Sequence, residues 1–196
     1  MNNDIIKYTE INLGGSEMKI VGVAGELTGW KATVVLHNVL EAAKDFDSNI
    51  ETELIEMKEY NIEFARGEPL SYYSDDTWNV VNTILSADIL VFGTPIYQAS
   101  ISGALKNLLD HFPVDAFKRK VTGIITTGAV EKHFLVADYQ LKPILSYLKG
   151  LVPSTNVFVH SDCFSDVNEI IDDNVKIRIR ALAEEMVRLQ KYVVSK

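Results

Sequence analysis

Residues 87–113 read ADILVFGTPIYQASISGALKNLLDHFP, a stretch that contains a strand, an unusual connection and a helix. The apolar run that ends at Gly93 is typical of a strand buried on both faces, which we place at 88–93. Apolar residues at helical spacing predict a helix over about 102–111. The connection between them, 94–101, has a proline, a tyrosine and small polar residues. It is longer than a plain strand-to-helix turn needs to be, and we interpret it as a functional loop.

The same alternation of strand and helix continues on both sides of this stretch. Residues 58–75 are predicted to form a long loop. Alternating apolar strands and helices indicate a parallel sheet covered by helices on both faces. We therefore expect an α/β protein with a flavodoxin-like, doubly wound sheet of five parallel strands in the order 2-1-3-4-5. The further strands are predicted at 18–24, 49–57, 121–128 and 155–160, and the further helices at 31–46, 75–86, 133–149 and from about 168 onward.

Length and composition limit the classes of protein to consider. The chain has 196 residues, enough for one domain, which we place at 18–196 after a polar extension of residues 1–17. A net charge of −8 disfavours a nucleic-acid surface. The single cysteine, Cys163, allows no internal disulfide or CxxC metal site, and the four histidines show no metal-ligand spacing. With no apolar run of roughly 20 residues and no recognisable signal peptide, we expect a cytoplasmic protein without a bound metal.

The predicted topology indicates where a ligand would bind. Doubly wound sheets bind ligands beyond the carboxyl ends of their strands, at the point where the strand order reverses. For this order the rule selects three loops, at 25–31, 94–101 and 127–133.

The first of these loops combines turn-forming glycines with groups that suit an anion. The stretch GELTGWKAT (25–33) leads into a helix whose first N–H groups favour negative charge. Thr28 and Thr33 offer hydroxyls, and Lys31 offers a positive charge. Glu26 argues against a phosphate here, because its carboxylate would repel one unless it points away. Glycine and threonine are also ordinary turn and cap residues, so a purely structural role stays open.

The second loop offers a flat, partly polar surface. A proline stiffens the turn, an isoleucine and a tyrosine present apolar and aromatic surface, and a glutamine can hydrogen-bond. Such a loop suits the face of a heterocycle. Alternatively, these residues only cover the core, and Ser100 or Ser102 only caps the next helix. The residues in question are Pro95, Ile96, Tyr97 and Gln98.

The third loop, TTGAVEKH at 126–133, lets the backbone turn its N–H groups toward a carbonyl edge of a ligand. Thr127 and Gly128 are the residues that permit this turn. His133 opens the next predicted helix, and we interpret it as a cap or surface residue rather than a catalyst.

Two stretches resemble a known family. The run GTPIYQASISGALKNLLDHFP (93–113) resembles a motif of the NAD(P)H-dependent FMN reductases. The run GAVEKHFLVADYQLKPILSYLKGLVP (128–153) looks like the branch that contains the FMN reductase component of two-component alkanesulfonate monooxygenases. The resemblance covers most of residues 18–165, and these two motifs are its specific part.

The resemblance implies FMN as the flavin and NADPH or NADH as the hydride donor, with no essential acid–base side chain. It also implies a homodimer or homotetramer, with Tyr139 as a candidate interface residue, and delivery of reduced flavin to a monooxygenase, a quinone or azo acceptor, or oxygen. The site residues that it implies are Thr28, Lys31 and Thr33 at the FMN phosphate, Pro95, Ile96, Tyr97 and Gln98 at the ring, and Thr127, Gly128 and Ala129 at the pyrimidine edge.

The sequence departs from this family pattern in two places. The first loop of the family usually reads Gly-Ser-Pro-Arg, whereas Glu26 and Leu27 replace the Ser-Pro here, and the Gly-Gly of the third loop is Gly128-Ala129. Two alternatives to the reductase stay open. One is a flavodoxin-like FMN electron carrier without a nicotinamide site. The other is a flavin-free interaction protein, for which Glu26 is the motivating residue.

Overall fold

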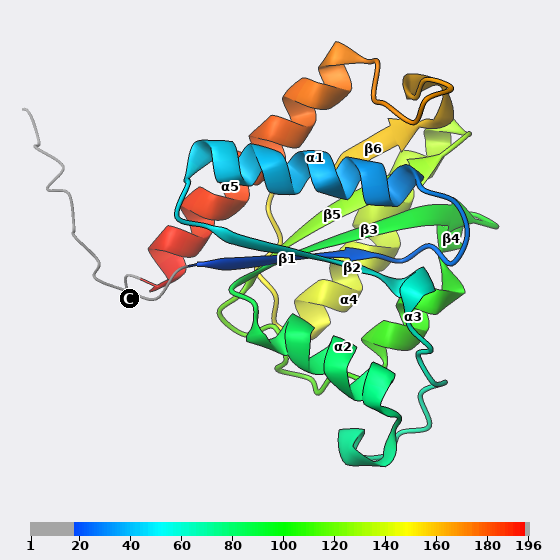
Figure 1. Ribbon diagram of the computed structural model, residues 1–196, viewed down its shortest axis with the longest axis vertical. Helices are drawn as coiled ribbons and strands as arrows, with labels where there is room; N and C mark the ends of the chain where they lie inside the picture. Colours follow the sequence, from blue (N-terminus) through cyan, green and yellow to red (C-terminus); the bar gives the residue numbers. More distant parts are fainter. Residues whose placement is uncertain (1–17, 195–196) are drawn as a thin grey trace, which may run out of the picture.

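The computed structural model describes residues 18–194, which form an open, twisted sheet with helices on both faces (Figure 1). The predicted extension, residues 1–17, lies outside the described residues. Parallel strands run in the order β2-β1-β3-β5-β6, and a short strand, β4, folds back against β3. Counted without β4, this is the predicted order 2-1-3-4-5, and the flavodoxin-like fold is confirmed. The strands are β1 (Lys19–Ala24), β2 (Glu51–Glu56), β3 (Ile89–Tyr97), β4 (Ser100–Ile101), β5 (Val121–Gly128) and β6 (Val157–His160).

Each face of the sheet has its own group of helices, as Figure 1 shows. The pair α1 and α5 covers one face, while α2, α3 and α4 cover the other. Neighbouring residues of a strand point to opposite faces, so β3 contributes Leu90 and Phe92 to one core and Ile89 and Val91 to the other. This two-sided burial explains why the strand sequences are apolar throughout. The helices are α1 (Lys31–Phe46), α2 (Asp75–Ser86), α3 (Gly103–Leu109), α4 (Lys142–Tyr147) and α5 (Asp173–Val194).

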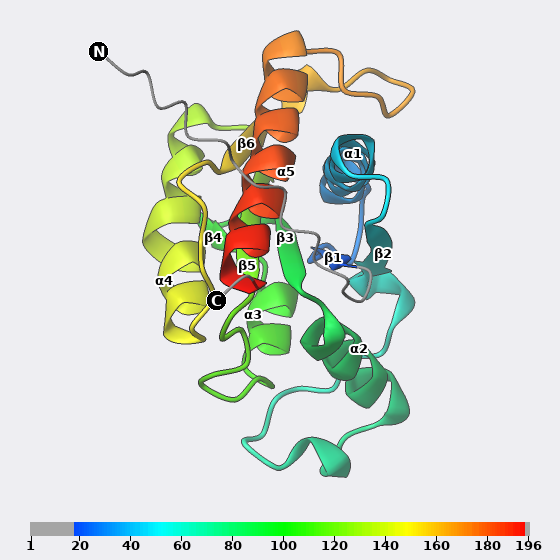
Figure 2. The same ribbon diagram turned by 90° about the vertical axis from the view of Figure 1, so that its left-hand side faces the viewer.

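The predicted long loop between β2 and α2 extends away from the sheet at one end of the molecule (Figures 1 and 2). We call this segment, residues 57–74, the excursion. It contains two 3-10 turns, Met57–Glu59 and Leu70–Tyr72. Its path is held by polar contacts, since the backbone N–H of Arg66 donates to the Tyr73 hydroxyl at 2.7 Å and the Arg66 guanidinium pairs with two glutamates. This excursion lies on the face of α2 and α3 and takes no part in the sheet.

The connection after β3 differs from the prediction. β3 does not end at Gly93 but continues to Tyr97. The end of β3 and the strand β4 form a tight hairpin within residues 94–101, where a loop was predicted. Thr94 and Pro95 stay in register with β5, opposite Thr126 and Thr127. The sequence Gly-Thr-Pro resembles the end of a strand because proline has no N–H to donate. Here β1 ends opposite Gly93, so at Thr94 and Pro95 only β5 pairs with β3.

The predicted helix 133–149 is also interrupted. A 3-10 turn (Glu131–Phe134) and a π-helical segment (Ala137–Leu141) precede α4. Pro143 explains the break, because it lacks an N–H and its ring crowds the carbonyl four residues earlier in a regular α-helix. The last strand and the last helix begin later than predicted, β6 at Val157 instead of 155 and α5 at Asp173 instead of about 168.

The sheet has two different edges. β2 forms one edge and carries Glu51 and Glu53, whose carboxylates lie 4.0 and 2.7 Å from the Lys19 ammonium on β1. The pKa of Lys19 is raised, and the hydrogen bond to the Glu53 carboxylate is the largest cause.

None of the helices within residues 18–194 has both the length and the apolar composition of a membrane-spanning helix.

Candidate functional site

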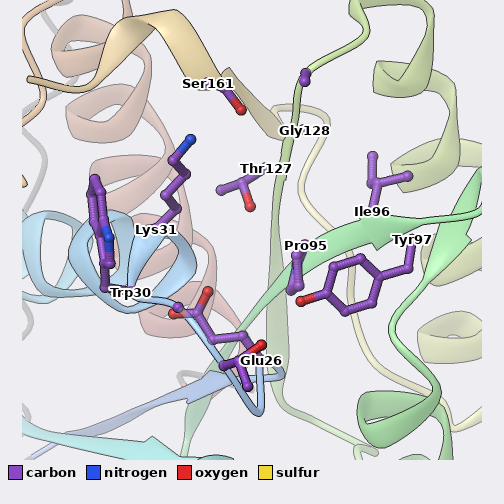
Figure 3. A pocket seen from close by; sticks show the side chains of 12 residues that line it. Glu26, Trp30, Lys31, Pro95, Ile96, Tyr97, Thr127, Gly128 and Ser161 are labelled. Atoms are coloured by element: carbon purple, nitrogen blue, oxygen red, sulfur yellow. The ribbon is translucent and has the colours of Figure 1, made fainter.

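A hollow of about 280 Å³ lies beyond the carboxyl ends of β1, β3, β5 and β6 (Figure 3). This is the edge of the sheet at which doubly wound folds bind their ligands. Its walls come from the turn between β1 and α1, the end of β3 and the turns after β5 and β6. The residues that line it are Glu26, Thr28, Gly29, Trp30, Lys31, Pro95, Ile96, Tyr97, Thr127, Gly128, Ala129 and Ser161.

Most of the predicted site residues therefore come together. Of the ten residues predicted to contact the flavin, all of them described, only Thr33 and Gln98 do not line the hollow. We call the wall made by Glu26–Lys31 the helix side, because it leads into α1. We call the wall made by Pro95–Tyr97, with Thr127–Ala129 beside it, the hairpin side. The role of each residue toward a ligand remains a prediction.

On the helix side, the start of α1 is capped by an internal carboxylate. Glu26 is buried, with 3% of its surface exposed, and its two carboxylate oxygens accept hydrogen bonds from the backbone N–H groups of Ala32 (3.2 Å) and Thr33 (3.0 Å). These N–H groups belong to the first turn of α1 and have no partner within the helix. Residues 31–34 include no acidic side chain, and Trp30 at the N-cap position makes no capping bond. Glu26 thus supplies the negative charge that the helix end favours.

The Thr33 hydroxyl points away from the hollow, toward β2. It donates to Glu56 Oε2 at 3.1 Å, and Glu56 also pairs with the Lys58 ammonium at 2.6 Å. The hydrogen bond from Lys58 is the main reason why the pKa of Glu56 lies below its usual range. The predicted phosphate role of Thr33 therefore has a competing contact, because both its N–H and its hydroxyl are already bonded to carboxylates.

Lys31 and Trp30 form the outer part of the helix side. The Lys31 ammonium lies 5.9 Å from the centre of the Trp30 ring and 5.4 Å from that of Phe164. The two rings meet edge to face at 5.2 Å. In Figure 3 the Lys31 side chain extends toward Ser161, which follows β6. Sequence reasoning missed Ser161, although it begins a fourth turn at the same edge of the sheet, where β6 ends.

On the hairpin side, Tyr97 is half-exposed and its hydroxyl points across the hollow, past Pro95 (Figure 3). The turn that follows has two consecutive residues with positive φ, Gln98 (49°) and Ala99 (60°), a pattern typical of a type I′ hairpin. Gln140, in the π-helical segment, fixes this turn. Its amide donates to the Ala99 carbonyl at 3.0 Å and accepts from the Ser100 hydroxyl at 2.6 Å.

The two sides meet under the hollow, at Gly25. Its N–H donates to the Gly93 carbonyl at 2.7 Å, and its carbonyl accepts from the Ser102 hydroxyl at 2.5 Å. The same hydroxyl accepts from the Leu105 N–H at 3.1 Å, so Ser102 is the N-cap of α3, as one of the two predicted alternatives stated. A Cβ on Gly25 would lie 2.8 Å from the Leu105 Cβ, which leaves room only for glycine.

These features define a flavodoxin-like protein with a hollow at the topological switch point of its sheet. The chain belongs to the NADPH-dependent FMN reductase family, whose model matches residues 18–163, and the family predicted from the two sequence motifs is confirmed.

Individual relatives agree with this assignment. The chain is 39% identical over 172 residues to an NAD(P)H-dependent FAD/FMN reductase of Geobacillus thermodenitrificans, a match that covers 88% of this chain and 93% of the relative. It is 29% identical to an FMN reductase (NADPH) of Pseudomonas aeruginosa, over 86% and 90% of the two chains. The solved structure of an NADH:FMN oxidoreductase (EMOB) superimposes with a TM-score of 0.71 at 21% identity, covering 91% of each chain, which supports the fold.

The two sides of the hollow differ in how well they fit FMN. The hairpin side offers an aromatic and apolar wall next to a turn of small residues, which suits the face and edge of a flavin ring. The helix side does not fit the phosphate in the predicted way. Glu26 already occupies the N–H groups of Ala32 and Thr33, to which a phosphate at the start of α1 would bind.

Proposed function

We infer that this protein is an NAD(P)H-dependent FMN reductase whose reaction takes place in the hollow at the strand ends. One observation carries the proposal. In a chain of the FMN reductase family, the residues predicted to hold the flavin ring, Pro95–Tyr97 and Thr127–Ala129, line one hollow at the switch point of the sheet. FMN, when bound, supplies the chemistry by accepting hydride from NAD(P)H.

The residues of the chain would serve to bind and align. Tyr97 and Pro95 form a wall against one face of the ring, and the small residues that follow on the chain leave space on the open side of the hollow. Alignment of two reactants supplies roughly 7–11 kcal/mol of a barrier. Backbone N–H groups of Thr127–Ala129 would stabilise negative charge at the pyrimidine edge, as an oxyanion hole does.

We expect that the reaction needs no acid–base side chain. Glu26 is the one carboxylic acid among the described lining residues, and both its oxygens are bonded to the N–H groups of α1. It therefore holds the helix end and is not directed at a reacting atom.

The finer points remain part of the proposal. The reduced flavin would pass to a monooxygenase, to a quinone or azo acceptor, or to oxygen, in the cytoplasm. A homodimer or homotetramer would use the face around Tyr139, which is 76% exposed and lies close in sequence to the exposed Phe134 and Leu135. Exposed apolar clusters of this kind are typical of protein interfaces.

The direct test is NADPH or NADH oxidation by the purified protein at saturating FMN in air, followed by absorbance. Steady oxidation with at least one nucleotide is expected. Absence of turnover with both would contradict the enzyme proposal.

Glu26 also favours a second candidate, the flavin-free interaction protein, because it fills the predicted phosphate position. A titration separates the two. A protein that leaves FMN fluorescence unchanged at every concentration would support the interaction protein.

A further inference from the structure

The corner of the hollow that would receive the phosphate is filled by a side chain of the protein itself. Glu26 lies where the first N–H groups of α1 converge, and it is almost fully buried there. We propose that this protein recognises its flavin substrate by the ring and not by the 5′-phosphate, so that riboflavin serves as well as FMN. Glu26 would be the residue that determines this specificity. The inference rests on the proposed flavin reductase function.

A phosphate would compete with the Glu26 carboxylate for the same hydrogen-bond donors. An anion at a helix start is held by the unpaired N–H groups of the first turn and by the helix dipole. In this protein a carboxylate takes both the Ala32 and the Thr33 N–H groups, at 3.2 and 3.0 Å. A phosphate would have to displace a buried, hydrogen-bonded group or stand next to a charge of its own sign. Both routes remove the affinity that a phosphate gains at an open helix end.

The charged groups near the start of α1 do not replace these donors for a phosphate. The Thr33 hydroxyl already donates to Glu56, a second carboxylate behind the helix start. Lys58 pairs with Glu56 at 2.6 Å, which leaves this group of charges with more acid than base. Among the described residues that line the hollow, Lys31 is the one lysine or arginine, and its ammonium lies near two aromatic rings at the outer rim.

The groups that remain available to recognise a flavin lie on the hairpin side. The hairpin side offers the Tyr97 ring, the Pro95–Ile96 wall and the backbone of Thr127–Ala129. These groups would contact the ring system, which riboflavin and FMN share, and none of them distinguishes a hydroxyl from a phosphate at the end of the ribityl chain. The substrate class is therefore flavins that have the isoalloxazine ring, with or without the phosphate.

The test is a pair of flavin-fluorescence titrations, with riboflavin and with FMN, in the absence of any nicotinamide nucleotide. For the native chain, the two dissociation constants are expected to agree within about threefold. Glu26→Ser frees the helix N–H groups while keeping a small hydroxyl, and we expect roughly tenfold tighter FMN binding with unchanged riboflavin binding. Glu26→Gln removes the charge but still fills the corner, so its ratio of FMN to riboflavin affinity should lie between those of the native chain and Glu26→Ser.

A matched control removes one negative charge from the same helix at a distance. Glu41→Gln, on the exposed part of α1, should leave both dissociation constants as in the native chain. Circular dichroism shows whether each variant is folded, and Glu26→Gln keeps the test valid if Glu26→Ser does not fold.

Two results would overturn the inference. One is a native chain that binds FMN more than about tenfold tighter than riboflavin. The other is an FMN-to-riboflavin affinity ratio that is the same in the native chain, Glu26→Ser and Glu26→Gln. Failure of the proposed function is distinguishable from either of these. Equal binding of both flavins without oxidation of NADPH or NADH would leave the inference standing and remove the enzyme proposal.

Discussion

The hairpin side and the helix side of the hollow are built in different ways. The hairpin side is a β-turn whose shape is set by backbone pairing and by the Gln140 side chain. The helix side is a loop whose character depends on one side chain, Glu26, which turns inward and meets the start of α1. A fold can therefore keep the part of a site that is made by strands while a single side chain changes the other part.

The largest expected effect is on the hairpin side. Tyr97→Ala removes the aromatic wall, and a stacking contact of this kind contributes roughly 1–3 kcal/mol. Flavin affinity should therefore fall by roughly 5- to 150-fold, for riboflavin and FMN alike. Fluorescence titration measures it, and Tyr72→Ala, an exposed tyrosine on the excursion, is the control. An unchanged affinity in Tyr97→Ala would mean that the hairpin does not form the ring wall.

A second substitution tests the point where the two sides meet. In Gly25→Ala the new methyl group would lie 2.8 Å from the Leu105 Cβ, so the loop and α3 must move apart. We expect a loss of about 1–3 kcal/mol in the free energy of unfolding, measured by urea denaturation. Gly103→Ala is the matched control, because its Cβ would meet no atom within 4 Å and should leave stability unchanged or slightly higher. Equal free energies of unfolding of the two variants would show that the close approach of Gly25 to Leu105 does not require a glycine.

A smaller effect is expected from the residue that holds the hairpin turn. Gln140→Ala loses the bonds to Ala99 and Ser100, each worth about 0.5–1.5 kcal/mol. Flavin affinity should fall several-fold, because Tyr97 directly precedes this turn. Gln140→Glu keeps the acceptor for Ser100 but places a carboxylate oxygen against the Ala99 carbonyl, so its affinity should be no higher than that of Gln140→Ala. A flavin affinity of Gln140→Ala equal to that of the native chain would contradict this assignment.

The smallest effect is expected at Lys31, on the helix side. If the phosphate makes no defined contact, Lys31→Met should change the dissociation constants of riboflavin and FMN by less than about threefold each. The same titrations measure it. A loss of about tenfold or more for FMN alone would restore Lys31 to its predicted role at the phosphate.

Much of the fold follows from hydrophobic spacing. The bounds of α1, α2 and β5 agree with the prediction, because apolar residues mark the buried side of each element and polar or glycine residues end it. The extension of β3 and the π-helical segment were missed. The extension of β3 through Pro95 depends on pairing with β5, a tertiary contact that local sequence does not reveal. The π-helical segment precedes Pro143, and hydrophobic spacing alone does not show how a helix adapts to a proline.

The site was predictable to the extent that it depends on strand ends. The switch-point rule selected the loops that carry the hollow, including Tyr97 and Thr127, because parallel strands finish at one edge of a sheet. The inward turn of Glu26 was not predictable, because it depends on the distance between its carboxylate and the first N–H groups of α1. Ser161 was missed for a simpler reason, since the turn after β6 was not included among the candidate loops.

The acidic edge strand β2 has a consequence for self-association. An exposed sheet edge is a template onto which another molecule can add a strand, and charged side chains oppose this. Two copies that met through β2 would bring Glu51 and Glu53 of one chain against the same carboxylates of the other, with only Lys19 from each chain to compensate. The charges of β2 therefore oppose the addition of a strand from another copy at this edge of the sheet.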